Sequence, residues 1–332
     1  MENKTFKALQ ISEKSDKQYD REIIQRQVSD LPAGEVLVRV HYSALNYKDA
    51  LSSVGNKGVT RNYPHTPGID AAGIVEESQS SDFKVGDEVI VTSYDLGMNT
   101  SGGLSEYIRV PARWIVAMPE GLSMREAMIN GTAGFTAALC INALINNGLS
   151  PDKGKVLVTG STGGVGILAV AMLRKLGFEV TAVTGKPEAH EFLLKAGANE
   201  IISREAMDDK SGRPMLKSVY AGVVDTVGGN ILATALKSLT YGGAAAICGL
   251  VASPDLPTSV LPFILRGNSL FGIDSAECPM SLRQEIWKKV ATEYKPIDLS
   301  LLATEITLEE VPKKLDIMLN GGAIGKSLVN LG

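Results

Sequence analysis

The stretch Lys155-Val156-Leu157-Val158-Thr159-Gly160-Ser161-Thr162-Gly163-Gly164-Val165-Gly166 joins an apolar strand pattern to a glycine-rich turn, and an apolar helix pattern follows over residues 167–176. Glycines let a backbone approach phosphate groups closely, and a helix N-terminus presents free N–H groups and the positive end of a dipole. This order of elements therefore predicts a site for the pyrophosphate of a dinucleotide. We expect the contacts to come from Thr162, Gly163, Gly164 and Val165.

The spacing of this turn distinguishes several classes of nucleotide site. It reads G-x-x-G-G-x-G rather than the commonest dinucleotide fingerprint, G-x-G-x-x-G, and a glycine turn by itself could be purely structural. No Gly-Lys-Ser/Thr follows, which disfavours a nucleoside-triphosphate P-loop. The turn also matches T-G-x-x-x-G-x-G of short-chain dehydrogenases. None of the nine tyrosines has the lysine four residues later that those enzymes need for proton transfer, so that class is excluded.

The next strand pattern, over residues 179–183, ends in Thr184-Gly185-Lys186. Sites that prefer NAD usually have an acidic residue here to bind the ribose 2′-hydroxyl. A neutral position followed by a cation suits a 2′-phosphate, so the sequence predicts NADPH, with Thr184, Gly185 and Lys186 in the site. Arg204 or His190 could also reach the phosphate. The alternative is that Lys186 only begins a solvated helix, with Pro187 at its first position.

On either side of residue 120 or so, the sequence shows different patterns of secondary structure. Residues 5–120 contain short strand patterns punctuated by glycine, proline and aspartate, such as the alternation of residues 36–42. After Ser123-Met124-Arg125-Glu126, which matches a helix capping box, strand and helix patterns alternate. The sequence therefore predicts an α/β protein, in which a doubly wound parallel sheet accompanies a mostly β domain. A last strand, over residues 326–329, could return to the β domain.

Composition excludes several functions. The 332 residues carry 33 Lys and Arg against 37 Asp and Glu, a net charge of −4, so we expect no nucleic-acid partner. The three cysteines (Cys140, Cys248, Cys278) suggest a reducing compartment rather than a disulfide scaffold. The first residues lack the apolar core of a signal peptide, and no uninterrupted apolar run is long enough to span a bilayer. We expect a cytoplasmic protein without a membrane partner.

Four segments resemble the medium-chain dehydrogenase/reductase superfamily: residues 46–49 (NYKD), 67–73 (PGIDAAG), 160–166 (GSTGGVG) and 225–229 (DTVGG). The chain is similar to the zinc-free quinone oxidoreductases, and within them to the YhdH/YhfP group that includes AcuI-type acrylyl-CoA reductases. The marks of that group are residues 45–51 (LNYKDAL), 131–137 (GTAGFTA) and 262–266 (PFILR). The resemblance implies a GroES-like catalytic domain (residues 1–128 and 277–332), a Rossmann NADPH-binding domain (129–276), a cleft between them and a homodimer.

The resemblance also bears on metal binding. Zinc alcohol dehydrogenases of this superfamily take ligands from a cysteine in the first motif and a His-Glu pair after the second. This chain has Asn46, Ile69 and Asp70 at those positions, and three cysteines cannot form a four-cysteine structural site. His41 and His65 are more simply explained by hydrogen bonding. We therefore expect no metal.

Without zinc, a site of this kind supplies geometry, a proton and electrostatics while NADPH carries the hydride. The resemblance implies reduction of an activated C=C bond, as in a short-chain enoyl-CoA such as acrylyl-CoA or an enone. Quinone reduction is the alternative, and a non-catalytic NADPH-binding sensor or scaffold is a second one. Tyr47 is the candidate for the nicotinamide wall and for the proton donor. Lys48 and Asp49 either position the substrate or form an ion pair.

Overall fold

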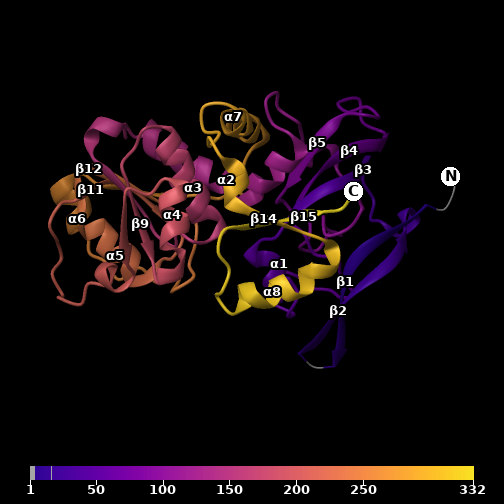
Figure 1. The fold of residues 1–332 in the computed structure, drawn as a ribbon, viewed down its shortest axis with the longest axis horizontal. Helices are drawn as coiled ribbons and strands as arrows, with labels where there is room; N and C mark the ends of the chain where they lie inside the picture. Colours follow the sequence, from indigo (N-terminus) through magenta and orange to yellow (C-terminus); the bar gives the residue numbers. More distant parts are fainter. Residues whose placement is uncertain (1–3, 16) are drawn as a thin grey trace. The chain divides into compact units, whose positions relative to one another are not determined.

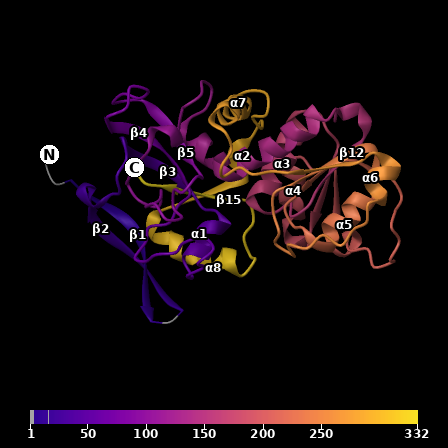
Figure 2. The ribbon, with the colours of Figure 1, turned by 180° about the vertical axis from the view of Figure 1, so that it is seen from behind.

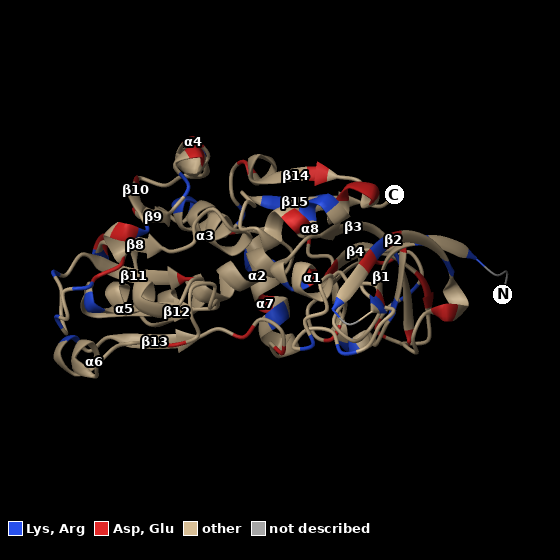
Figure 3. Ribbon diagram, turned by 90° about the horizontal axis from the view of Figure 1, so that it is seen from below, with Lys and Arg blue, Asp and Glu red and all other residues tan. Residues whose placement is uncertain are grey.

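A computed structural model describes residues 4–15 and 17–332, and its residues divide into two compact units. Unit 1 comprises the chain up to Thr132 together with residues 276–288 and 303–332, and unit 2 comprises residues 133–275 and 289–302. Each unit has its own sheet (Figure 1). Lys and Arg are interspersed with Asp and Glu along both (Figure 3).

Unit 2 is built on a six-stranded sheet whose neighbouring strands are all parallel. The strand order is β10-β9-β8-β11-β12-β13, so the direction of winding reverses between β8 and β11. Ligands of doubly wound sheets bind at such a reversal, beyond the carboxyl ends of the strands. The predicted doubly wound sheet is thereby confirmed. The strands are β8 (Lys155–Val158), β9 (Val180–Thr184), β10 (Glu200–Ser203), β11 (Tyr220–Asp225), β12 (Leu239–Ile247) and β13 (Ser269–Gly272).

Helices surround this sheet (Figures 1 and 2). The first after the glycine turn, α3, packs on β8, β9 and β11, while α5 packs on β11 and β12. The helix bounds are α3 (Gly164–Lys175), α4 (His190–Ala196), α5 (Gly229–Lys237) and α6 (Leu261–Arg266). Helix α7 (Met280–Ala291) lies mostly in unit 1. These elements place the glycine turn between β8 and α3, as the sequence predicts.

Helix α2 (Met124–Asn146) begins with the predicted capping box and is interrupted at Gly131, where φ is 52° and ψ is −156°. The predicted capping box therefore begins the first of two helical parts, and the break at Gly131 is their junction. By length and composition α2 could cross a membrane, but 83% of its most apolar window is buried within the structure. That degree of burial is typical of a core helix.

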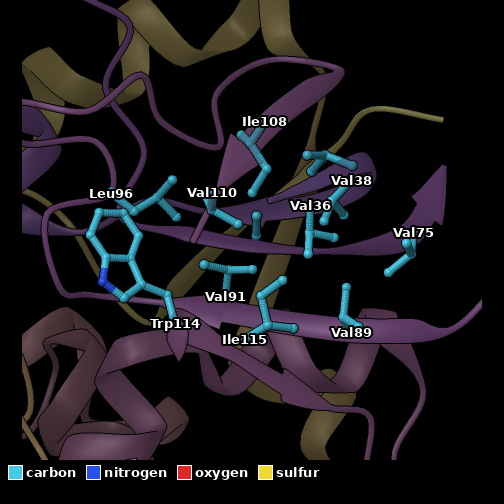
Figure 4. Close-up of a cluster of buried hydrophobic side chains, with 12 residues drawn as sticks. Val36, Val38, Val75, Val89, Val91, Leu96, Ile108, Val110, Trp114 and Ile115 are labelled. Atoms are coloured by element: carbon cyan, nitrogen blue, oxygen red, sulfur yellow. The ribbon is translucent and has the colours of Figure 1, made fainter. Parts of the chain in front are cut away.

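Unit 1 contains a seven-stranded, largely antiparallel sheet and a separate hairpin of β1 (Thr5–Ser15) and β2 (Gln18–Gln27). The sheet runs β14-β15-β3-β4-β5-β7, and β6 pairs with β3. One face buries a cluster dominated by valine and isoleucine, including Val36, Val38 and Ile108 (Figure 4). The strands are β3 (Val36–Ala44), β4 (Asp70–Ser78), β5 (Glu88–Thr92), β6 (Tyr107–Val110), β7 (Ile115–Ala117), β14 (Ala303–Ile306) and β15 (Lys326–Asn330).

The predicted return of residues 326–329 to the β domain is confirmed. As β15, this segment lies between β14 and β3, with Leu328 opposite Ala44. Two helices of the same unit, α1 (Tyr47–Ser52) and α8 (Val311–Leu319), contact each other. Helix α1 was not predicted from the sequence, and it is only six residues long.

Candidate functional site

The glycine turn of unit 2 depends on close backbone contacts. Gly160 adopts a φ of +59°, and a Cβ there would lie 2.2 Å from Thr226 Oγ1. A Cβ on Gly166 would lie 2.3 Å from the carbonyl oxygen of Gly160. Both contacts are far shorter than any side chain tolerates, so α3 can pack this tightly against the turn only with glycine at both positions.

The start of α3 is free of side-chain caps. Its N-cap residue is Gly163, which has no side chain and makes no side-chain cap hydrogen bond. Ser161 is instead turned inward, where its Oγ donates to Val158 O at 2.7 Å and accepts from Val183 N at 3.0 Å. The predicted contact residues Gly163, Gly164 and Val165 therefore form a helix N-terminus whose N–H groups and dipole suit an anion.

A pocket beside this turn brings together five of the residues proposed from sequence, namely Thr162, Thr184, Gly185, Lys186 and Arg204. The lining also includes residues that sequence reasoning did not assign to the cofactor: Thr159, Gly160, Val183, Val227 and Ile231. Thr159 and Gly160 belong to the quoted turn, and Val227 belongs to the DTVGG segment, so a signal for these three existed. His190 is not among the lining residues.

Two cations meet in this pocket. A Cβ on Gly185 would lie 3.2 Å from an Nη atom of Arg204, so the guanidinium group rests against that glycine. Burial lowers the pKa of Lys186 from its ordinary value, Glu188 raises it, and the charge of Arg204 lowers it further. Thr184 Oγ1 accepts from Lys186 N at 3.0 Å, which fixes the backbone between them. Two neighbouring positive charges beside a helix N-terminus favour a phosphate group.

Asp225, which ends β11, holds two residues of the pocket lining, Thr159 and Val227. Its carboxylate accepts from Thr159 Oγ1 at 2.6 Å and from the backbone N–H groups of Val227 and Gly228 at 3.2 and 2.8 Å. Burial raises the pKa of Asp225, and these hydrogen bonds lower it. Asp225 thus fixes the ends of β8 and β11 to each other, at the reversal point of the sheet.

Unit 1 holds a second polar site, the buried polar cluster, which consists of Asn46, Asp49, Asp70, Thr132 and Lys326. Asp70 is fully buried, and its carboxylate accepts hydrogen bonds from Asn46 Nδ2 at 2.8 Å, Thr132 Oγ1 at 2.5 Å and Thr132 N at 2.9 Å. Thr132 directly follows the break at Gly131, so Asp70 caps the second half of α2. A carboxylate at that helix N-terminus is stabilised by the dipole.

Asp49 and Lys326 complete the buried polar cluster. Asp49 accepts from the backbone N–H groups of Asn46, Gly68 and Ile69 at 2.7, 3.0 and 3.1 Å. Burial raises its pKa to about 7, although those hydrogen bonds lower it. Lys326 Nζ donates to Leu45 O at 3.2 Å and to Asn46 Oδ1 at 3.4 Å. Burial lowers its pKa, whereas the charges of Asp70 and Asp49 raise it.

Helix α1 lies over this cluster and carries Tyr47, which is 51% exposed. Asp49 is the third residue of α1 and closes a capping box with Asn46. Lys48 Nζ lies 3.9 Å from Met98 Sδ, and the described contacts include no ion pair between Lys48 and Asp49. Of the two alternatives for these residues, the ion pair is not found because Asp49 is buried and accepts from backbone N–H groups, and a role in positioning the substrate stays a prediction. Tyr47 and the dinucleotide pocket lie in different units, so its assignment to the nicotinamide wall stays a prediction.

The positions that bind zinc in the related dehydrogenases are occupied here by hydrogen-bonding groups. Asn46 offers an amide and Asp70 a carboxylate already engaged by Thr132, and neither is a soft ligand. Among residues 4–15 and 17–332, no group of three or more His, Cys, Asp and Glu side chains is arranged to hold a metal ion. His65 Nε2 instead lies 2.9 Å from Gly97 O, consistent with a histidine that is simply hydrogen-bonded.

Comparisons with known proteins agree with this geometry. Residues 32–120 match the alcohol dehydrogenase GroES-like domain, and residues 164–292 match a family described as zinc-binding dehydrogenase. The chain is 47% identical to YhfP of Bacillus subtilis, named as a quinone oxidoreductase, over 98% of this chain and 99% of that protein. It is 43% identical to the acrylyl-CoA reductase AcuI of Ruegeria pomeroyi, over 92% and 93% of the two chains.

Solved structures are equally similar. The yhdH oxidoreductase of Salmonella enterica in complex with NADP superposes with a TM-score of 0.95 at 45% identity, covering 98% of this chain and all of that one. The yhfP protein of Bacillus subtilis with NAD bound gives a TM-score of 0.96 at 46% identity, with coverage of 99% and 100%. Both forms of the dinucleotide are thus found among the chain's structural relatives.

Proposed function

Since the chain belongs to the quinone oxidoreductase family of medium-chain dehydrogenases/reductases, in the group of YhfP and AcuI, we propose that it is a zinc-independent, NADPH-dependent oxidoreductase. Its substrate is an activated C=C bond, best presented by a short-chain enoyl-CoA such as acrylyl-CoA. The observation that carries the proposal is the pocket of unit 2, whose lining combines Lys186 and Arg204 with Thr162, the residue before the N-cap of α3. This arrangement suits a dinucleotide that bears an additional phosphate.

The chain's own residues bind and orient the cofactor. The N-terminus of α3, with Thr162, Gly163, Gly164 and Val165, holds the pyrophosphate, and Thr184, Gly185, Lys186 and Arg204 hold the 2′-phosphate. Bound NADPH supplies the hydride. Addition of hydride at the β-carbon places negative charge on the thioester oxygen, which backbone N–H groups or a hydroxyl must stabilise before the α-carbon is protonated. Zinc has no role in this scheme, because Asn46 and Asp70 replace its ligands.

Tyr47 has two candidate roles in the proposed reaction, packing against the nicotinamide ring and donating the proton. Its exposed position on α1 leaves its hydroxyl accessible. If the hydroxyl donates the proton, Tyr47→Phe lowers kcat by about 10²-fold, within the usual range for general acid catalysis. If only the ring acts, Tyr47→Phe retains activity and Tyr47→Ala raises the KM for NADPH. Steady-state kinetics of the two variants separates these roles.

Two substrate classes are supported by relatives, since AcuI is named as an acrylyl-CoA reductase and YhfP as a quinone oxidoreductase. We place the thioester first because the CoA moiety supplies binding energy, remote from the reacting bond, that can orient the alkene. A quinone lacks such a handle. The third possibility is an NADPH-binding sensor or scaffold without turnover.

One experiment decides between these functions. NADPH consumption by the purified protein is measured with acrylyl-CoA, crotonyl-CoA, simple enones and quinones. We expect kcat/KM to be highest for acrylyl-CoA. Quinone turnover without enoyl-CoA reduction would reverse the order of the two substrates, and NADPH binding without turnover would favour the sensor. Elemental analysis on the same sample should find no stoichiometric zinc, and chelators should leave the activity unchanged.

We also propose that the protein forms a homodimer through the β13 edge of the six-stranded sheet. Within the described residues β13 pairs only with β12, so its outer edge is open to another strand. Large apolar side chains are exposed on α6 and the preceding loop: Leu250, Val251, Val260, Ile264 and Leu265. Light scattering should give twice the 35.2 kDa chain mass, and a charged residue in place of Ile264 should lower it. The cytoplasmic location, and the lack of nucleic-acid and membrane partners, stay predictions.

A further inference from the structure

Helix α1 and the segment after it carry three cations on the surface of unit 1, which we call the cationic patch: Lys48, Lys57 and Arg61. Lys48 is half-buried, and the other two are exposed. Residues 47–63 contain a single acidic residue, Asp49, which is buried and accepts from backbone N–H groups. The whole chain has a net charge of −4, so the exposed charge of this segment is opposite in sign to that of the protein.

A loop at Met98 and Asn99 joins the members of the cationic patch. Lys48 Nζ lies 3.9 Å from Met98 Sδ. The backbone N–H of Arg61 donates to Asn99 Oδ1 at 3.2 Å, and Lys57 Nζ donates to the backbone oxygen of Arg61 at 3.3 Å. The start of α1 and the segment that follows this helix therefore meet at the same loop.

Two of the three charges lack a counter-ion. Lys57 forms a salt bridge with Glu13 at 3.4 Å, whereas neither Lys48 nor Arg61 forms one with a carboxylate in the described part of the chain. Asp95, which precedes this loop, accepts hydrogen bonds from two neighbouring side chains at 2.9 and 2.8 Å. A partly desolvated cation without a counter-ion forms strong, charge-assisted hydrogen bonds with an anion that reaches it.

An apolar stripe lies beside these cations on α1. Tyr47 is 51% exposed and Val54 is 41% exposed. Leu51, which is half-buried, is four residues from one and three from the other, so the three side chains are neighbours on one helix face. Val54 N donates to Leu51 O at 3.3 Å, which continues the helical turn as far as Val54. The surface thus offers a ligand both apolar contacts and positive charge.

We propose that the cationic patch binds the phosphate groups of coenzyme A, while the apolar stripe of α1 contacts the pantetheine arm that carries the thioester. This inference rests on the proposed function, because it concerns the CoA part of that substrate. The half-buried Lys48 makes the stronger contact, and the guanidinium group of Arg61 can donate two hydrogen bonds to one phosphate. These contacts lie away from the reacting C=C bond, so their binding energy can orient it.

The test compares acrylyl-CoA with acrylyl-pantetheine, which has the same thioester but no phosphate. In the wild type we expect a lower KM for acrylyl-CoA. Lys48→Met should raise that KM about tenfold and Arg61→Met about threefold, because partly buried charged contacts contribute more than exposed ones. Neither variant should change kcat or the KM for acrylyl-pantetheine. Lys84→Met, which replaces an exposed lysine of the same unit, is the matched control and should resemble the wild type.

A second measurement does not require turnover. Titration calorimetry of CoA into protein saturated with NADP⁺ detects the same phosphate contacts, and the saturation keeps CoA out of the dinucleotide pocket. The Kd for CoA should rise in Lys48→Met and Arg61→Met by the same factors as the KM. High salt should weaken CoA binding to the wild type, because it screens exposed charges.

Four results would overturn the proposal: equal KM values for the two thioesters in the wild type, an equal rise in both KM values in the variants, an equal loss in Lys84→Met, or a Kd for NADPH that rises as much as the KM for acrylyl-CoA. A wild type that reduces neither thioester would contradict the proposed function. The CoA titration would then still decide whether the cationic patch binds phosphate groups.

Discussion

The glycine turn of unit 2 and the buried polar cluster of unit 1 are both polar sites, but they are built from different parts of the chain. The turn uses backbone groups from one short stretch, residues 159–166, and the side chains of Lys186 and Arg204 line the same pocket. The buried polar cluster uses side chains from four distant segments, around residues 46–49, 70, 132 and 326. Its carboxylates accept hydrogen bonds from several internal donors, whereas Lys186 and Arg204 lie together in the lining of a pocket.

This contrast predicts that the pocket of unit 2 determines ligand affinity and that the buried polar cluster determines folding stability. In an anion site the cations contact the ligand, so removing a cation there should alter affinity and leave folding largely intact. Buried charges that are held by internal groups should behave in the opposite way, because removing one of them leaves buried neighbours uncompensated. The following substitutions test that division.

The largest effect is expected at Lys326. Lys326→Met removes the buried cation near Asp49 and Asp70 and should lower the free energy of unfolding by about 3 to 5 kcal/mol. Urea denaturation measures this loss. Lys313→Met, at an exposed position on α8, is the matched control and should stay within about 0.5 kcal/mol of the wild type. Equal stability of the two variants would show that the cation does not stabilise the cluster.

A smaller effect, confined to affinity, is expected at Lys186. Lys186→Ala should raise the Kd for NADPH by roughly ten- to a hundredfold, since a hydrogen bond to a charged group contributes about 1.5 to 3 kcal/mol. The Kd for NADH should hardly change. Arg204→Ala should show the same selectivity. Titration calorimetry with both cofactors measures the ratio, and an equal loss for NADH would mean that neither side chain binds the 2′-phosphate.

Gly166→Ala should weaken the binding of both dinucleotides. The added methyl group must push α3 away from Gly160 O, and overpacking of this kind costs about 1 to 3 kcal/mol. Because the shift acts on the pyrophosphate rather than the 2′-phosphate, NADPH and NADH should lose affinity to the same degree. Gly58→Ala, which meets only an Asn56 side chain at 3.1 Å, is the control. A loss for NADPH alone would contradict the pyrophosphate assignment.

The smallest effect is a pH dependence carried by Asp49. Its pKa of about 7 in the folded protein lies above the ordinary carboxyl value, so the folded state binds the proton more tightly than the unfolded state. Stability from this group is therefore lost as pH rises through 7, by about 1.4 kcal/mol between pH 6 and pH 8. Asp49→Asn should remove that slope, although it costs an acceptor.

Unfolding of the Asp49 variant by urea at both pH values, beside exposed Asp82→Asn as control, measures the difference in slope. If Asp49→Asn and the wild type lose the same stability between pH 6 and pH 8, another group carries the dependence.

How much could be predicted from sequence follows from the same contrast. The β8–turn–α3 unit was predictable because its glycines and apolar residues are adjacent in the chain and each has a local physical reason. Thr184, Lys186 and Arg204 could also be predicted, because they lie at or just after the carboxyl ends of the neighbouring strands β9 and β10. The capping box at Ser123 is also purely local.

The buried polar cluster was out of reach for the opposite reason. Nothing near Lys326 in the sequence indicates that its ammonium group is buried, because it joins Asn46 only through the pairing of β15 with β3. For Asp49 the sequence left two alternatives open, an ion pair with Lys48 or a role in positioning the substrate. The short helix α1 turns the two side chains apart, and backbone donors from residues 68 and 69 outcompete the lysine.

The position of β15 has a consequence for how the protein is made. Unit 2 is mostly one continuous segment, residues 133–275, and its parallel sheet is complete once β13 has been synthesised. Unit 1 is translated first, yet its sheet lacks an inner strand until residues 326–330 arrive to separate β14 from β3. Domains tend to fold as units while the ribosome is still working. The part of the chain that is translated first is therefore the part that finishes folding last, and until then it exposes the edge of β3 to other strands.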